Sequence, residues 1–154
     1  MTMFLISLLC LNSFIGFMIY KIFYKKRKLY DDRFGMIMAM SCSGILSLNL
    51  SMIVQFLFPE NFSIVMIISV IVCGLIGVLF GSLVKFQSLL AGFFNGIVGG
   101  LMGNMLGLVI KDPSICSLPA AYLTNINQNM MLFGVFGTFL AGVTIFFVFY
   151  SLKV

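Results

Sequence analysis

The residues best suited to chemistry lie in one apolar stretch, residues 35–51, with the sequence GMIMAMSCSGILSLNLS. On a helix, Met36 and Met40 are about one turn apart, so their thioether sulfurs could face a single ion. Thioethers are soft ligands that suit Cu(I), which makes this pair a candidate metal site. Packing is the competing interpretation, because methionine supplies 12 of 154 residues, occurs in every apolar stretch and fills uneven cores well. Met38 and Cys42 fall on roughly the opposite face and cannot join the same site.

The Met36 and Met40 pair, together with a glycine ladder from Gly92 to Gly107, resembles the arrangement in the Ctr-type copper transporters. That family forms trimers in which a methionine pair lines the pore and glycines pack the helices. The resemblance implies that Met36 and Met40 would be the pore sulfurs. The chain departs from the family pattern, which has three spans and usually a methionine-rich extracellular segment, because it has five apolar stretches and no such segment.

Uncharged polar side chains form a second candidate site. Ser43, Ser47 and Ser51 follow one another at steps of four, so they form a ladder on one helix face. This ladder could line a hydrated path or donate hydrogen bonds to neighbouring helices. Asn95 and Asn104 flank the glycines of a later stretch and could either bond across a helix contact or meet a permeant species. Both roles would pair amides that are costly to leave unpaired in hydrocarbon.

Composition excludes several classes of chemistry. The chain has no histidine, which removes imidazole catalysis and imidazole metal ligation. Its four acidic residues lie between the apolar stretches, so neither a paired-carboxylate site nor an intramembrane proton relay is predicted. No Walker-type phosphate loop is present either. We therefore expect no enzyme and no bound cofactor, and we expect any transport to be passive or driven by a partner subunit.

The overall composition predicts an all-α integral membrane protein. Hydrophobic residues make up 62% of the chain and charged residues 8%, against about 25% charged in a typical soluble domain. A spanning helix needs about 20 apolar residues. Residues 2–20 lack the basic region and cleavage site of a secretory signal, so we expect a retained first span. A single domain over residues 1–154 with five spans is predicted, at about 2–20, 34–58, 62–84, 88–110 and 130–150.

Charge predicts the orientation. Most basic residues follow the first span, at Lys21, Lys25, Lys26, Arg27, Lys28 and Arg33. The segment 21–33 should therefore be a cytoplasmic loop that contacts anionic headgroups rather than nucleic acid, with the amino terminus outside and the carboxyl terminus inside. Residues 111–129 would form an external loop. The absence of a presequence, and a composition typical of AT-rich genomes, favour the bacterial cytoplasmic membrane.

Glycines at helical spacing mark the third, fourth and fifth spans. Each glycine costs a helix about 1 kcal/mol relative to alanine, so a glycine face makes sense where another backbone approaches closely. We predict glycine-mediated packing, within one protomer or between protomers. The fourth stretch could instead form a re-entrant pair broken at its glycines. The packing residues are Gly92, Gly96, Gly99, Gly100, Gly103 and Gly107 in the fourth span, Gly74, Gly77 and Gly81 in the third, and Gly134 and Gly137 in the fifth.

Two functional hypotheses follow from these patterns. The first is a passive transporter or channel for a small solute or a soft metal ion such as Cu(I), based on the methionine pair, the serine ladder and the two asparagines. The second is a non-transporting accessory or scaffold subunit that binds another membrane protein through the glycine faces, based on the lack of intramembrane charge. Either function fits a homo-oligomer or a complex with another membrane protein.

Overall fold

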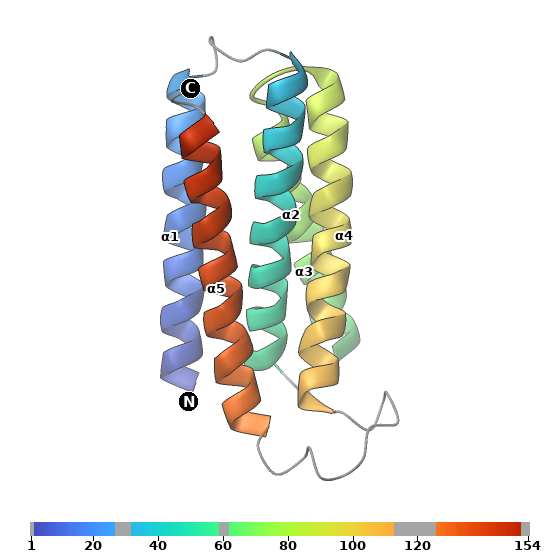
Figure 1. Cartoon of the computed structure of the whole chain (residues 1–154). Coiled ribbons are helices and arrows are strands. Elements are labelled where there is room, and N and C mark those ends of the chain that lie inside the picture. Colours follow the sequence, from blue (N-terminus) through green and yellow to red (C-terminus); the bar gives the residue numbers. More distant parts are fainter. Residues whose placement is uncertain (1, 27–31, 59–61, 113–125, 152–154) are drawn as a thin grey trace.

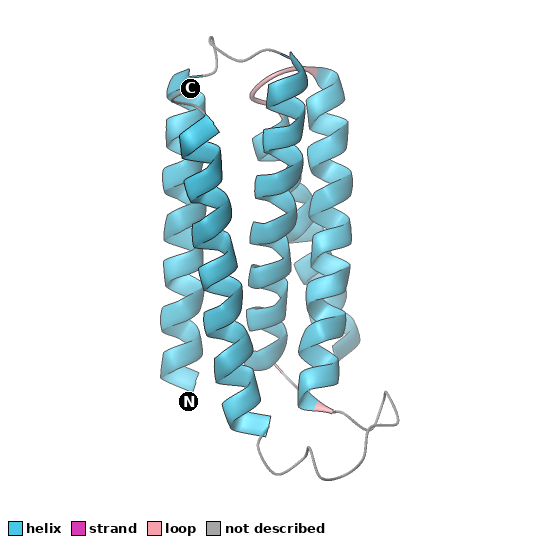
Figure 2. Cartoon of the chain, in the orientation of Figure 1, coloured by secondary structure: helices cyan, strands magenta, loops and turns pink. Residues whose placement is uncertain are grey.

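The computed structural model describes residues 2–26, 32–58, 62–112 and 126–151, and this part of the chain is all-helical (Figure 2). All five of its helices are long and apolar enough to cross a membrane, which confirms the prediction of five apolar helices. They are α1 (Thr2–Lys26), α2 (Asp32–Leu57), α3 (Phe62–Gly81), α4 (Phe86–Lys111) and α5 (Ile126–Ser151) (Figure 1).

Several helices begin or end at residues other than those predicted for the spans. Helix α1 continues to Lys26 instead of ending near residue 20, because lysine is a good helix former whose long stem can lie along apolar surface. Helix α3 ends at Gly81 rather than residue 84, and a tight turn reverses the chain before α4 begins. Helix α5 begins at Ile126, ahead of the predicted residue 130. Residues 27–31 and 113–125 of the two predicted loops lie outside the described residues.

The glycine-rich stretch forms one continuous helix, so the re-entrant alternative is wrong. Helix α4 runs without a break from Phe86 to Lys111, and its last turn is closed by a bond from Asp112 N to Leu108 O at 2.8 Å. The helix holds because its glycines are buried against neighbouring helices rather than exposed. Five continuous helices with alternating direction place the start of α1 and the end of α5 at opposite ends of the bundle (Figure 1).

One end of the bundle carries most of the described positive charge. We call it the basic end, and it is where α1 and α3 finish and α2 and α4 begin (Figure 1). Lys21, Lys25, Arg33 and Lys85 lie there, whereas Lys111 lies at the opposite end. This arrangement is the charge asymmetry on which the predicted orientation depends.

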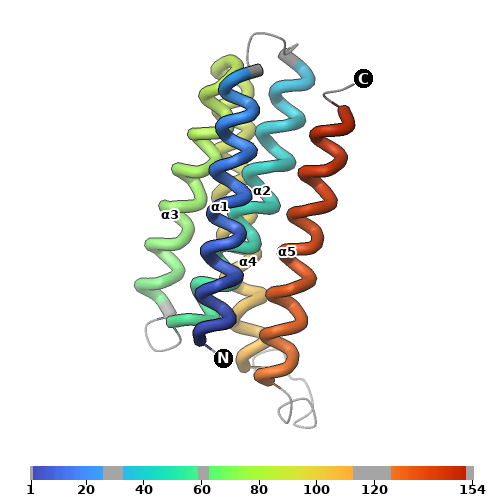
Figure 3. The backbone as a smooth tube through the Cα atoms, turned by 90° about the vertical axis from the view of Figure 1, so that its left-hand side faces the viewer, coloured from blue at the N-terminus to red at the C-terminus, as the bar shows by residue number. Residues whose placement is uncertain are grey.

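Helix α2 occupies the centre of the bundle. It contacts each of the other four helices, and its contact with α4 is the most extensive. Helices α3 and α4 pack as a pair on one side of α2, and α1 and α5 lie on the other (Figures 1 and 3). A core cluster toward the basic end includes Met38, Cys42 and Phe80, and a second cluster toward the opposite end includes Met52 and Met130. The glycine-rich α4 is therefore a flank of the bundle, with α2 as its axis.

Candidate functional site

The predicted serine ladder of α2 lies against the glycines of α4. Ser43 is completely buried, and its hydroxyl donates to Gly92 O across the helix contact at 3.2 Å. Ser47 is equally buried and donates to its own helix at Gly44 O, 3.0 Å away. Its hydroxyl occupies the space that a Cβ atom at Gly99 would need. The hydroxyls are therefore paired and the space beside them is filled.

The same pattern continues toward the opposite end of α2. The Ser51 hydroxyl donates to Leu48 O at 3.1 Å and blocks the Cβ position of Gly103. One turn further along, a Cβ atom at Gly107 would lie 2.8 Å from Cβ of Gln55. The α2–α4 contact is thus closed along the length of both helices.

The two glycine ladders of α4 face different neighbours. A Cβ atom at Gly92 would lie 2.5 Å from Gly77 O, and one at Gly96 would lie 2.5 Å from Cys73 O, both on α3. Real Cβ atoms essentially never approach a carbonyl oxygen so closely, so a side chain at either position would push α3 away. The ladder toward α3 consists of Gly92, Gly96 and Gly100, and the ladder toward α2 consists of Gly99, Gly103 and Gly107.

The predicted glycines of α3 and α5 also lie at contacts within this chain. The Cβ position of Gly77 is blocked by Gly92 O, and that of Gly81 by the backbone of Ser88 and Leu89. At Gly74 a Cβ atom would lie 3.3 Å from the Phe93 ring, a contact that a small shift relieves. The remaining two positions are Gly134, which faces Leu8 of α1, and Gly137, which faces Asn49 of α2.

Of the two predicted asparagines, one bonds across a helix contact. Asn104 is completely buried, and its Nδ2 donates to Ser69 Oγ on α3 at 2.7 Å and to Gly100 O at 2.8 Å. Asn95 is only half-buried, and its Nδ2 donates to Ala91 O of its own helix at 3.2 Å. The structure therefore connects Asn104 to α3 and leaves Asn95 at the edge of the α4 contact face.

The predicted methionine pair lies outside these contacts. Met36 is 37% exposed and Met40 is 36% exposed, whereas Ser43, Ser47 and Ser51 of the same helix are buried. Helix α4 covers the part of α2 that carries the serines and leaves the methionines outside that contact. The structure does not bring the two sulfurs together with the buried polar groups of α2.

The sequence reasoning did not identify Asn12 and Asn49 as buried polar residues of the bundle. Asn49 donates from Nδ2 to Gly137 O of α5 at 2.7 Å, so it attaches α5 to α2. Asn12 is completely buried in α1 and donates to Leu8 O at 3.0 Å. An amide side chain in the middle of an apolar helix is itself the signal that could have identified both. Among the described residues, the buried side-chain oxygens without a hydrogen-bond partner are those of Asn12, Asn49, Gln55 and Asn104.

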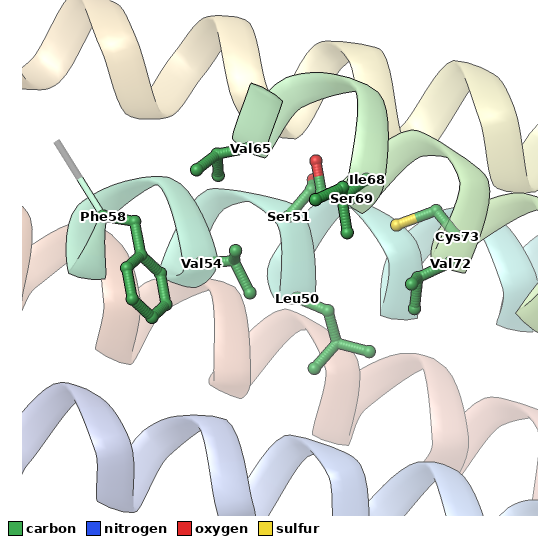
Figure 4. A pocket seen from close by; sticks show the side chains of 9 residues that line it. All are labelled: Leu50, Ser51, Val54, Phe58, Val65, Ile68, Ser69, Val72 and Cys73. Carbon is green, nitrogen blue, oxygen red and sulfur yellow. The ribbon is translucent and has the colours of Figure 1, made fainter. Parts of the chain in front are cut away.

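Lateral grooves between the helices are apolar. A groove of about 370 Å³ lies between α2 and α3, and Figure 4 shows the side chains that line it. Polar atoms in its wall are bonded to backbone, since Ser69 Oγ donates to Met66 O at 3.1 Å and Cys73 Sγ donates to Ser47 O at 3.5 Å. A groove of about 280 Å³ separates α5 from α2 and α4. These surfaces suit hydrocarbon rather than a hydrated solute.

Comparison of the chain with protein-family models, with curated proteins and with solved structures finds no match. A functional interpretation therefore depends on the contacts described above. Ser43, Asn49 and Asn104 bond across helix contacts. The buried hydroxyls of Ser47 and Ser51 bond within their own helix. None of four grooves on the described helices is lined mainly by polar groups.

Proposed function

We propose that the protein is a non-transporting accessory or scaffold subunit that binds another membrane protein within the bilayer. The observation that carries this proposal is the enclosure of the serine ladder between α2 and α4. Ser43, Ser47 and Ser51 are the residues best placed to line a path, and they are buried against glycine backbone. Opening a path there would separate the two helices with the most extensive contact in the bundle.

We further propose that the protein spans a bacterial cytoplasmic membrane with its amino terminus outside and its carboxyl terminus inside. The concentration of Lys21, Lys25, Arg33 and Lys85 at the basic end supports this orientation. Lysines and arginines at that end would contact anionic headgroups, each contributing about 1 kcal/mol near the surface.

The proposed contact with a partner uses α5, because the glycines of α3 and α4 already face helices of the same chain. Gly142 is exposed on α5, and a Cβ atom there would meet nothing within 4 Å. Glycine inside a helix costs about 1 kcal/mol, and no contact with the described part of the chain offsets that cost at this position. The exposed rings of Phe139 and Phe146 lie about one turn before and after Gly142, and the proposed partner helix packs on Gly142 between them.

Crosslinking in native membranes tests this contact. A photoreactive residue in place of Phe139 should give a heterologous adduct, and Gly142→Leu should reduce its yield while Gly142→Ala changes it little. If the only adduct has twice the mass of the chain, the protein forms a homo-oligomer and the proposal of an accessory subunit fails. If the only adducts are with lipid, α5 does not contact a partner protein and the proposed contact is refuted.

A second candidate function is a passive transporter for a small solute or a soft metal ion such as Cu(I). It is favoured by the buried amide oxygens that have no partner, since a passing donor or cation could use them. Liposomes containing the purified protein should show no flux of Cu(I), Ag(I) or small neutral solutes if it is a scaffold. Flux that disappears in Met36→Leu/Met40→Leu would establish a metal path, and flux lost in Asn104→Leu would establish a solute path.

A further inference from the structure

A lateral groove runs along α2 between α1 and α3. These two helices both pack on α2, and their backbones come close to one another at very few positions. The groove consists of a cavity of about 320 Å³ lined by all three helices and the 370 Å³ cavity between α2 and α3, and Leu50 lines both. From Leu46 to Phe58 it follows α2 for roughly 18 Å at 1.5 Å per residue. We call it the α1–α3 groove.

Aromatic rings cover the groove at the basic end. Tyr20 of α1 and Phe80 of α3 meet edge to face with ring centroids 6.1 Å apart, and both line the groove. Phe23 packs on Phe80 in the same way at 6.2 Å. Below this contact the wall is aliphatic, and the polar atoms of Ser69 and Cys73 turn away to backbone carbonyls. A ligand would meet rings at one end and hydrocarbon at the other.

Asn12 supplies the one amide in the wall of this groove. Its side chain is completely buried, Nδ2 donates to Leu8 O, and Oδ1 has no partner. A buried amide oxygen without a donor is unfavourable in a medium that contains no water. In this structure protein atoms cover Oδ1, so a ligand in the groove reaches it only when the Asn12 side chain turns toward the groove. A ligand that brings a hydroxyl there would then supply the missing donor, which a hydrocarbon chain cannot do.

The depth of Asn12 restricts the class of ligand. It lies roughly 15 Å along α1 from Thr2, which is near the middle of a hydrocarbon layer about 30 Å thick. A phospholipid keeps its headgroup at the interface and would bring only acyl chain to this level. A neutral molecule without a charged headgroup can place a hydroxyl there.

We propose that the α1–α3 groove binds a neutral hydrophobic molecule with a hydroxyl donor, which bonds to Asn12 Oδ1. The combined rings and aliphatic wall suit an alkylated phenol or hydroquinone, and a long-chain alcohol offers the same donor without the ring. Each cavity falls within the roughly 300–1,000 Å³ typical of small-molecule sites. This binding goes beyond the scaffold function and does not depend on it.

Equilibrium binding to the full chain in nanodiscs tests the proposal with a matched pair of probes. Decylhydroquinone and its dimethyl ether share ring and tail, and only the first has donors. The hydroquinone should bind about three- to twentyfold more tightly, the range expected for one hydrogen bond in a membrane protein. Equal binding of the two probes to the wild-type chain would overturn the proposal without any variant. Competition with hexadecanol distinguishes the two ligand classes. If hexadecanol displaces the hydroquinone, the site binds alcohols in general, and if it does not, the site requires a ring-bearing molecule.

Two variants locate the site. Asn12→Leu should remove the preference for the hydroquinone while binding of the ether persists, and Ser13→Ala, an exposed position on the same wall, should leave the preference unchanged. Leu50→Phe should fill space beside both cavities and lower the binding affinity of both probes. A preference that survives Asn12→Leu in a folded chain would place the hydroxyl elsewhere and refute the assignment.

Discussion

Replacing Gly103 by alanine tests whether the α2–α4 contact depends on the absence of a side chain. The added Cβ atom would collide with Ser51 Oγ and Leu48 O of α2. Ser51 can rotate its hydroxyl, but the carbonyl of Leu48 belongs to a helix backbone and cannot move alone. The two helices must therefore separate. Gly142→Ala is the matched control, because the same substitution at that position meets nothing within 4 Å.

The expected magnitudes have opposite signs. Alanine in place of glycine inside a helix gains about 1 kcal/mol, and this gain applies at both positions. Forcing a methyl group into a filled contact costs about 1–3 kcal/mol, and the upper part of that range applies at Gly103 because backbone blocks the space. We expect Gly103→Ala to lower the free energy of unfolding by about 1–2 kcal/mol and Gly142→Ala to raise it by about 1 kcal/mol.

Reversible unfolding in mixed micelles, followed by far-ultraviolet circular dichroism during a titration with sodium dodecyl sulfate, measures both values. The double variant Ser51→Ala/Gly103→Ala removes one of the two blocking atoms and should recover part of the loss, and a double-mutant cycle isolates that part. If Gly103→Ala and Gly142→Ala change the unfolding free energy equally, the close approach of α2 and α4 is not what the glycine provides, and the reasoning fails.

Two other changes address α5 and the orientation. Asn49→Leu removes the bond to Gly137 O and should lower the free energy of unfolding by about 0.6–1.7 kcal/mol in the same assay. Proteolysis of α5 should also become faster. The control Thr144→Ala loses hydrogen bonding within its own helix only and should leave α5 protected. In a chain whose native cysteines are replaced by alanine, Lys111→Cys should react with an impermeant maleimide in intact cells and Lys85→Cys only after permeabilisation; the reverse pattern would invert the proposed topology.

The sequence predicts the helices well and their ends poorly. Five apolar runs near or above 20 residues can only be satisfied in lipid as helices, so their existence follows from composition. The end of α1 is different, because Lys21, Lys25 and Lys26 are compatible with a loop or with a helix whose lysine stems lie along apolar surface. Hydropathy does not distinguish these two cases.

The glycine spacing indicates a contact face but not its partners. Steps of four place all six α4 glycines within about one third of the helix circumference, which predicts one face. The structure divides that face between α2 and α3 because both helices lie against it, one on each edge. Asn12 shows the corresponding limit for the candidate site: nothing in the sequence of α1 indicates that α3 would lie far enough from it to leave a groove.

The central position of α2 follows from the kind of polarity that each helix carries. Helices α2 and α4 are the two least apolar of the five over their best membrane-spanning windows. In α4 glycine contributes much of this, because it lowers hydropathy without adding a side chain that needs a partner. Helix α2 carries Ser43, Ser47, Ser51, Asn49 and Gln55, and all five are buried. Ser43 bonds to α4 and Asn49 bonds to α5, so α2 carries polar groups with partners on more than one neighbouring helix. A helix with such groups on several faces is stabilised by being surrounded. Helix α3, the most apolar, can expose isoleucine to acyl chains at no cost. Polar side chains that need partners therefore explain why α2, and not the glycine-rich α4, is the axis of this bundle.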